Sequence, residues 1–320
     1  MLHGCFASSR YTSTVLFVLS LLVMLSAAWL PASCASVAQP ALPAFLGVFS
    51  SRIVSALLYV FAAILLSRQT FFDRGVRWLG ALYLWFVAVC TFVNGNPVIA
   101  FAALLFLISI ILLLFCQYSV NPVGLLFASF LLLGVLTFVT PYSLFFIPLY
   151  LLFCLLTNIF SARGVAASLL GLITPFWLVM GTAYLFPVVN DALMLFFESV
   201  PAIFSVAFSG VTLLHLLLIV LVLVVLIPSA VAFVGSASPA KPLLRRRISF
   251  VIVANIYLLL LFLVVAGGAG LFFMCQLPFV AILASYLFAK KETRLSNVYL
   301  IFINIIMVAV ATQSLWLMHW

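Results

Sequence analysis

Long apolar runs fill nearly the whole chain, and short, mostly basic loops separate them. Of its 320 residues, 68% are hydrophobic and only 5% are charged, whereas a soluble domain carries about 25% charged residues. A surface exposed to water cannot be covered by so few charges, so lipid must be the solvent for most of it. We therefore expect an all-α fold, a polytopic transmembrane helix bundle with no soluble domain.

The apolar runs are close to the ~20 residues that a helix needs to cross the hydrocarbon core of a bilayer. They predict about 11 spans in a single integral membrane domain, residues 1–320. The first run also has the pattern of a signal peptide, because Arg10 precedes it and small residues follow Leu30. We favour an uncleaved span. The expected spans are 15–30, 48–66, 78–93, 98–116, 123–139, 143–160, 164–186, 206–234, 248–266, 271–289 and 296–317.

The basic stretch 241–247 sets the expected orientation. Lys and Arg residues beside a span stay on its cytoplasmic side. With eleven spans and a cytoplasmic amino terminus, the loops after spans two, six, eight and ten are cytoplasmic, and they hold eleven of the thirteen basic residues. The carboxyl terminus is then periplasmic. This pattern predicts a multi-pass protein of the bacterial inner (cytoplasmic) membrane.

The net charge of +9 does not indicate nucleic acid. The basic residues lie singly or in small groups between apolar runs, so they form no basic face of the kind that binds a phosphate backbone. The six cysteines lack metal-ligand spacing, and the common soluble-enzyme motifs are absent. No metal or cofactor is expected. The expected partners are membrane lipids and other envelope proteins.

A candidate binding site on the outer face combines one base and two acids. Arg52 is the only base expected there, beside the start of the second span. Asp191 and Glu198 are seven residues apart in the segment 187–205, which we expect to form a short helix at the membrane surface. A helix places both acids on one face. Arg52 either pairs with an acid or extends to the interface, or its planar guanidinium holds a phosphate of a lipid-linked substrate.

His215 is a second candidate, because it falls in the eighth expected span. A polar side chain inside a membrane costs free energy unless it has a partner, so it marks either a ligand site or a bond to a neighbouring helix. We expect its ring to face the protein interior. Four amides in the later spans are expected to bond between helices: Asn255, Gln276, Asn304 and Gln313.

Three prolines, Pro148, Pro175 and Pro278, lie within or near the ends of spans. Each lacks a backbone N–H and can open the helix ladder. Kinked spans often line cavities, but proline is also an ordinary residue of membrane helices. The sequence leaves both interpretations open.

The middle of the chain has a recognisable pattern. A Phe-rich span pair with a proline turn precedes an Arg-containing loop and a span that starts Gly-Leu-x-x-Pro. This pattern, over residues 121–186, resembles an uncharacterised family of multi-span inner-membrane proteins of Bacteroidota, a domain of unknown function. The resemblance implies an inner-membrane location and no particular chemistry. The matching residues are Phe127, Gly134, Pro141, Arg163, Gly171, Leu172 and Pro175.

Three classes of function fit the sequence, and it does not decide whether the chain is an enzyme. A non-catalytic component of a cell-envelope complex is favoured, since it needs no polar site. A membrane-embedded transferase acting on polyprenyl-linked sugars would suit apolar grooves, but such enzymes usually carry an acid in the first large outer loop, and residues 31–47 contain none. A lipid or small-solute transporter would need a polar path through the spans.

Overall fold

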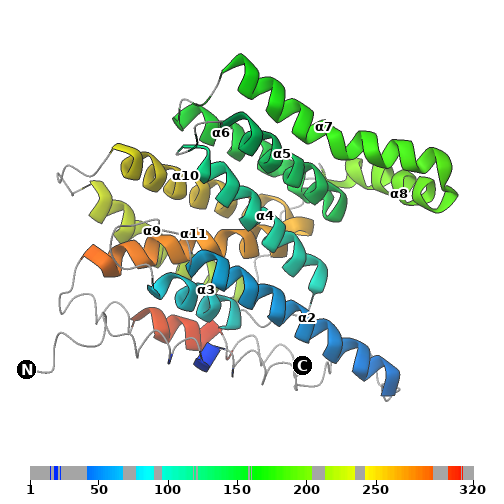
Figure 1. Cartoon of the computed structure of the whole chain (residues 1–320). Coiled ribbons are helices and arrows are strands. Elements are labelled where there is room, and N and C mark those ends of the chain that lie inside the picture. The colour runs from blue at the N-terminus through cyan, green and yellow to red at the C-terminus, as the bar shows by residue number, and fades with distance from the viewer. Residues whose placement is uncertain are drawn as a thin grey trace, which may run out of the picture. The chain divides into compact units, whose positions relative to one another are not determined.

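The computed structural model of the chain is built from helices (Figure 1). Within the described residues no strand occurs, which confirms the expected all-α fold. The structure describes residues 15, 18–20, 22, 42–67, 77–89, 96–117, 119, 122–157, 159, 161–203, 213–234, 242–290, 302–310 and 312.

The helices follow one another with short connections. Two of them, η1 and η2, are 3₁₀ helices, and residues 302–310 are also helical. The labelled elements are α2 (Leu42–Ser67), α3 (Arg77–Val89), α4 (Pro97–Phe115), α5 (Pro122–Val139), η1 (Pro141–Phe146), α6 (Ile147–Thr157), α7 (Ala162–Leu185), α8 (Pro187–Ile203), α9 (Leu213–Val234), α10 (Pro242–Val264), η2 (Ala266–Gly268) and α11 (Ala269–Lys290).

Residues that favour a helix start occur at the beginning of several helices. Four of the described α-helices begin with a proline, namely Pro97, Pro122, Pro187 and Pro242, and so does the 3₁₀ helix η1. Proline suits the first helical position, because the N–H that it lacks would have no partner there. Helix α7 instead has Ser161 as its N-cap, whose Oγ accepts a hydrogen bond from the backbone N–H three residues later at 3.0 Å.

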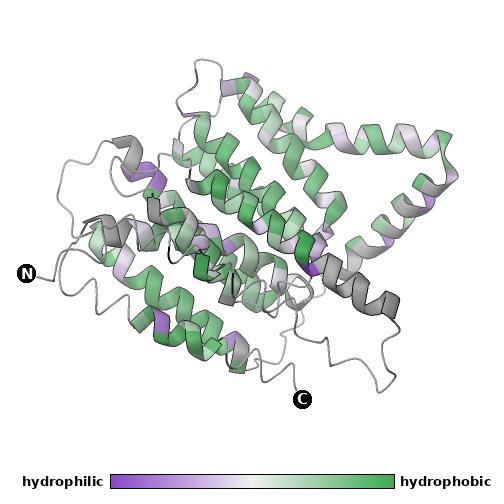
Figure 2. Ribbon diagram, turned by 60° about the horizontal axis from the view of Figure 1, so that its bottom comes forward, coloured by the Kyte–Doolittle hydropathy of each residue, from purple (hydrophilic) through white to green (hydrophobic). Residues whose placement is uncertain are grey.

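Five of the described helices are long and apolar enough to cross a membrane. They are Pro97–Phe115, Pro122–Val139, Ala162–Leu185, His215–Phe233 and Arg245–Val264. Shorter apolar helices occupy Arg52–Ser67, Leu79–Ala88, Pro141–Thr157 and Ala269–Ser285. Figure 2 shows that most residues along these helices are hydrophobic.

The helices from α2 to α11 keep the order of the expected spans. The sixth expected span begins as η1 and continues as α6, and the segment expected to form a short helix is α8. The expected spans 15–30 and 296–317 fall largely outside the described residues. The count of about 11 spans therefore remains a prediction.

The chain divides into two compact units. Unit 1 comprises Met1–Ala100, Gly210–Asn255 and Gln276–Trp320, and unit 2 comprises Phe101–Ser209 and Ile256–Cys275. The expectation of a single domain over residues 1–320 stays a prediction.

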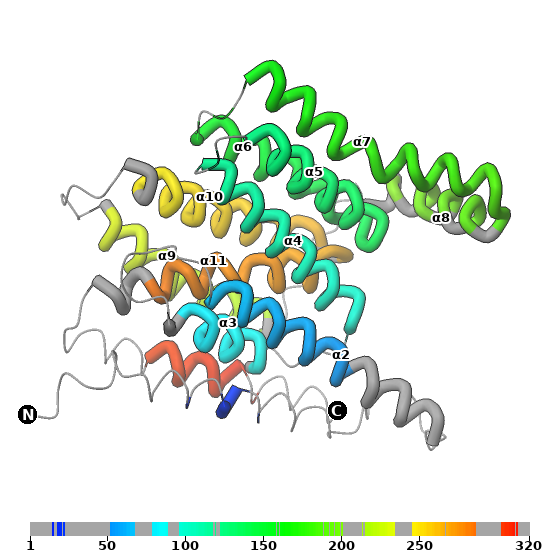
Figure 3. Tube along the Cα trace, viewed as in Figure 1, coloured from blue at the N-terminus to red at the C-terminus, as the bar shows by residue number. Residues whose placement is uncertain are grey.

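Two glycines let α5 and α7 of unit 2 approach each other closely (Figure 3). A Cβ added at Gly134 would lie 2.7 Å from the carbonyl oxygen of Leu172 and 2.9 Å from Pro175. A Cβ at Gly171 would collide with the carbonyl oxygen of Phe127. Small residues permit such close backbone packing, which stabilises helix pairs in membranes, where no hydrophobic force acts between helices.

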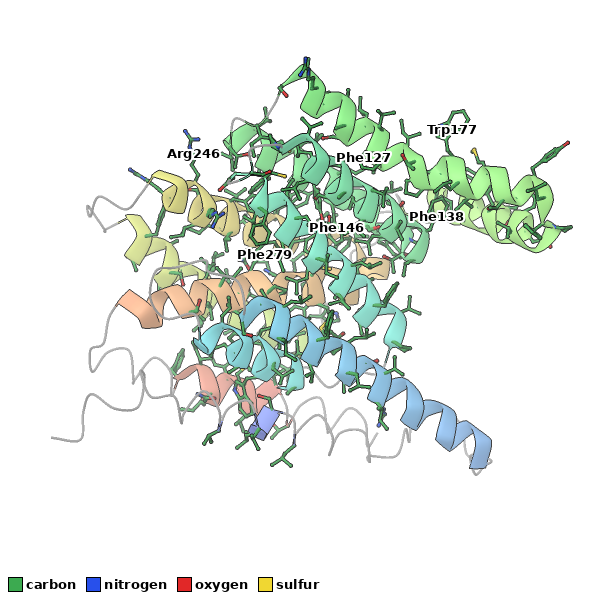
Figure 4. All side chains as sticks on the ribbon, in the orientation of Figure 1. Phe127, Phe138, Phe146, Trp177, Arg246 and Phe279 are labelled. Atoms are coloured by element: carbon green, nitrogen blue, oxygen red, sulfur yellow. The ribbon has the colours of Figure 1, made fainter. Side chains whose placement is uncertain are left out.

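Aromatic rings fill the core of unit 2. The ring of Phe146 lies 4.5 Å from that of Phe106 and 5.7 Å from that of Phe272, measured between centroids. Phe130 contacts Tyr150 edge to face at 5.5 Å. Figure 4 shows Phe146 inside the bundle, so the 3₁₀ turn η1 carries a central packing residue.

Helix α7 is longer than its neighbour α5, with 24 residues against 18. It continues past the end of α5 and the chain returns along it as α8 (Figure 3). In its second half Trp177 is 73% exposed and Tyr184 is 91% exposed, and Trp177 points away from the bundle (Figure 4). This side of α7 is covered by no described residue of the chain.

Unit 1 packs α2 against α3 by the same device as α5 against α7. A Cβ at Gly80 would lie 2.6 Å from the carbonyl oxygen of Ala63. The rings of Phe250 and Phe279, on α10 and α11, meet edge to face at 6.1 Å. Close backbone contact and ring packing therefore stabilise each unit internally.

Candidate functional site

Arg52 and His215, two of the four predicted site residues, belong to unit 1. Arg52 lies in α2 and is half-buried. His215 is the third residue of α9, so it lies in the first turn of that helix. Its side chain is also half-buried. The prediction that its ring faces the protein interior stays a prediction.

Asp191 and Glu198 both lie on α8, in unit 2. The helix expected between them is present. Seven residues are close to two turns, so the two acids point to the same side of α8, and both are exposed. The structure thus brings these two predicted residues onto one face. Their pairing with Arg52, which belongs to the other unit, stays a prediction.

Groups of three or more His, Cys, Asp or Glu side chains that could hold a metal ion are not found among the described residues. The described cysteines Cys116, Cys154 and Cys275 are free thiols, and all three are buried. These thiols do not gather into a metal-binding cluster.

The basic stretch begins α10 and divides its arginines between two environments. Arg245 and Arg246 are exposed, whereas Arg247 is buried, with 6% of its surface accessible. Figure 4 shows Arg246 pointing away from α10. Exposed bases at the end of a span suit a headgroup region.

Two of the four predicted amides, Asn304 and Gln276, bond between helices as expected, whereas the amide of Asn255 bonds to Val251 of its own helix. The indole N–H of Trp85 on α3 donates to Oδ1 of Asn304 at 3.1 Å. Nε2 of Gln276 on α11 donates to the backbone oxygen of Asn255 on α10 at 3.0 Å. The fourth predicted amide, Gln313, lies outside the described residues.

The amides Asn255 and Gln276 are nevertheless only partly satisfied. Both residues are fully buried, at 0% exposure. Oδ1 of Asn255 and Oε1 of Gln276 have no hydrogen-bond partner among the described residues. Buried polar atoms without partners are rare in native proteins, so this pair calls for an explanation.

Pro175 and Pro148 have different surroundings in the structure. Pro175 lies against Gly134 in the α5–α7 contact. Pro148 follows η1 and lacks the N–H that would reach back to the carbonyl of Phe145 in 3₁₀ geometry. The hydroxyl of Tyr257 on α10 donates to that carbonyl oxygen instead, at 2.7 Å. At Pro175 the structure supports the packing interpretation.

Two bonded groups were missed by sequence reasoning. Buried Ser109 and Ser129 join α4 to α5 by hydrogen bonds. The hydroxyl of Tyr257 donates a hydrogen bond to the backbone oxygen of Phe145. The signal for the serines was available, because each is a polar residue in the middle of an apolar run. Nothing in the sequence names their partners.

No family model, curated protein or solved structure matches the chain. The resemblance of residues 121–186 to the Bacteroidota family therefore stays a prediction. Five of the residues that carry it lie together at the α5–α7 contact, so packing accounts for that part of the pattern. They are Phe127, Gly134, Gly171, Leu172 and Pro175.

Proposed function

We propose that this integral membrane protein is a non-catalytic component of a cell-envelope complex. The observation that carries the proposal is a set of side-chain hydrogen bonds that join one helix to another. The described bonds of Ser109, Ser129, Trp85 and Tyr257 all run between helices. Polar side chains that bond one helix to another stabilise a scaffold, and these side chains are then not available to bind a substrate.

The proposal includes the threading of the chain. We place it in the bacterial inner membrane with about 11 spans, a cytoplasmic amino terminus and a periplasmic carboxyl terminus. The exposed bases Arg245 and Arg246 support a cytoplasmic start of α10. The exposed acids of α8 support a headgroup or aqueous position for that helix, since a carboxylate in hydrocarbon is costly.

A second candidate, a lipid or small-solute transporter, is favoured by one specific observation. The unpartnered oxygens of Asn255 and Gln276 are polar atoms within long apolar helices. A transport path would need such groups. They are two atoms among many satisfied ones, so the scaffold remains the better-supported function.

Purification from native membranes into polymer-bounded discs tests the proposal. We expect a second envelope protein to be present at a fixed molar ratio, measured by native mass spectrometry. Liposomes reconstituted with the purified chain alone should show no solute flux above protein-free liposomes. A chain that is isolated without a protein partner and moves solute or lipid would replace the scaffold with the transporter.

A further inference from the structure

Asn255 of α10 and Gln276 of α11 are fully buried, and the carbonyl oxygen of each side chain has no partner in the part of the chain that the structure describes. Both residues belong to unit 1. Pro278 follows on α11 and removes one backbone donor from that helix.

The orientation of each amide is fixed by its nitrogen. Nδ2 of Asn255 donates to the backbone oxygen of Val251 at 3.0 Å, and Nε2 of Gln276 donates to the backbone oxygen of Asn255 at 3.0 Å. Rotating either amide by half a turn would set one oxygen against another. The network therefore assigns the unpartnered atoms as oxygens.

The two amides are close enough for one small molecule to join them. Nε2 of Gln276 lies 3.0 Å from the backbone oxygen of Asn255, so the two residues meet at one contact between α10 and α11. A small molecule that donates two hydrogen bonds reaches an acceptor on each side of it. A single bridging molecule can therefore serve both residues.

The donors and acceptors of the two amides indicate which kind of molecule could bridge them. Each amide nitrogen carries two hydrogens, and the bonds above use one of each. The pair thus offers two acceptors and two donors. A metal cation would meet the N–H groups as repulsive neighbours, and an anion would meet the oxygens in the same way. Water both donates and accepts, and a buried water typically makes about three hydrogen bonds.

We propose that Asn255 and Gln276 form a binding site for one buried water molecule between α10 and α11. The proposal goes beyond the scaffold function and does not depend on it. The water satisfies both carbonyl oxygens and joins two side chains that share no bond with each other, because Gln276 bonds to the backbone of Asn255. The two amides are then coupled only through their shared ligand.

A cryo-EM map of the protein in lipid discs, at about 2.5 Å or better, should show one density within hydrogen-bond distance of both amides. A map of that quality with no density between them overturns the proposal. A variant series supplies a second test. Asn255→Leu and Gln276→Met should each lower the Tm by about 2–4 °C, while the double variant should lose less than the sum.

Asn304→Leu is the matched control, because Oδ1 of Asn304 already has Trp85 as its donor. Its loss should add to that of Gln276→Met without coupling. Losses that add fully for Asn255→Leu and Gln276→Met would show that no ligand is shared. Replacing Na⁺ by K⁺ or choline at constant ionic strength should leave the Tm unchanged, and a Tm that follows one cation would overturn water as the ligand.

Discussion

Ser109 of α4 and Ser129 of α5 each donate a hydrogen bond to the backbone of the other. Oγ of Ser109 lies 2.7 Å from the carbonyl oxygen of Ser129, and Oγ of Ser129 lies 2.9 Å from the carbonyl oxygen of Ser109. The two hydroxyl oxygens are 3.2 Å apart. Both serines are fully buried, so this reciprocal pair fixes how the two helices meet.

Removing either hydroxyl should weaken this contact. Ser109→Ala and Ser129→Ala should each cost about 0.6–1 kcal/mol in the free energy of unfolding, as interhelical bonds in membranes do. Unfolding in mixed micelles measures both. Ser285→Ala is the control, because the hydroxyl of buried Ser285 bonds within its own helix, to Ile282. Equal losses at all three positions would argue against a special role for the pair.

The α5–α7 contact should reject any side chain larger than hydrogen. Gly134→Ala and Gly171→Ala force their methyl groups into backbone atoms of the facing helix, so each should destabilise by about 1–3 kcal/mol. Gly181→Ala is the matched control on α7, since nothing lies within 4 Å of its added Cβ. It should be neutral or stabilise by about 0.5–1 kcal/mol. Thermal unfolding that ranks the three variants alike would contradict the close approach.

Tyr257→Phe should lower the stability of the protein, because the carbonyl oxygen of Phe145 near Pro148 loses its hydrogen bond from Tyr257. The variant removes the donor to the carbonyl of Phe145 and leaves the ring, so we expect a loss of about 1 kcal/mol. Tyr184→Phe serves as the control, because Tyr184 is 91% exposed and should lose almost nothing. Chemical unfolding measures the free energy of unfolding of both variants. An unchanged Tyr257→Phe variant would mean that Phe145 finds another donor.

The proposed threading places the two ends of α7 on opposite sides of the membrane. Ala162 and Asn190 are both exposed and lie at or beyond those ends. In a cysteine-free background, Asn190→Cys should react with an impermeant maleimide in spheroplasts, whereas Ala162→Cys should react only after permeabilisation. Labelling of both sites from the outside would refute the orientation derived from the basic loops.

The helices were predictable because hydrocarbon thickness fixes the length of a span. Apolar runs set the order from α2 to α11, and the interruption 187–205 predicted α8. The faces of the helices were not predictable. Helix α4 is apolar all round its surface, so hydropathy cannot say which side meets α5. That side is set by Ser109, whose partner is chosen by geometry.

The candidate site was predictable to the same limited extent. The spacing of Asp191 and Glu198 placed them on one helical face, because helical periodicity is local. The amides Asn255 and Gln276 were expected to bond between helices, and Gln276 does. The unpartnered oxygens could not be foreseen, because they follow from which backbone carbonyl each nitrogen reaches.

The bond between Trp85 and Asn304 joins residues 219 positions apart within unit 1. A ribosome delivers these residues in order, so the indole N–H of Trp85 enters the membrane long before Asn304 has been made. Unit 1 is assembled from three separate pieces of chain, and its last partner arrives with the third. Until then, the indole N–H of Trp85 lacks this acceptor. The bond between these two helices of unit 1 can therefore form only after nearly the whole chain has been made.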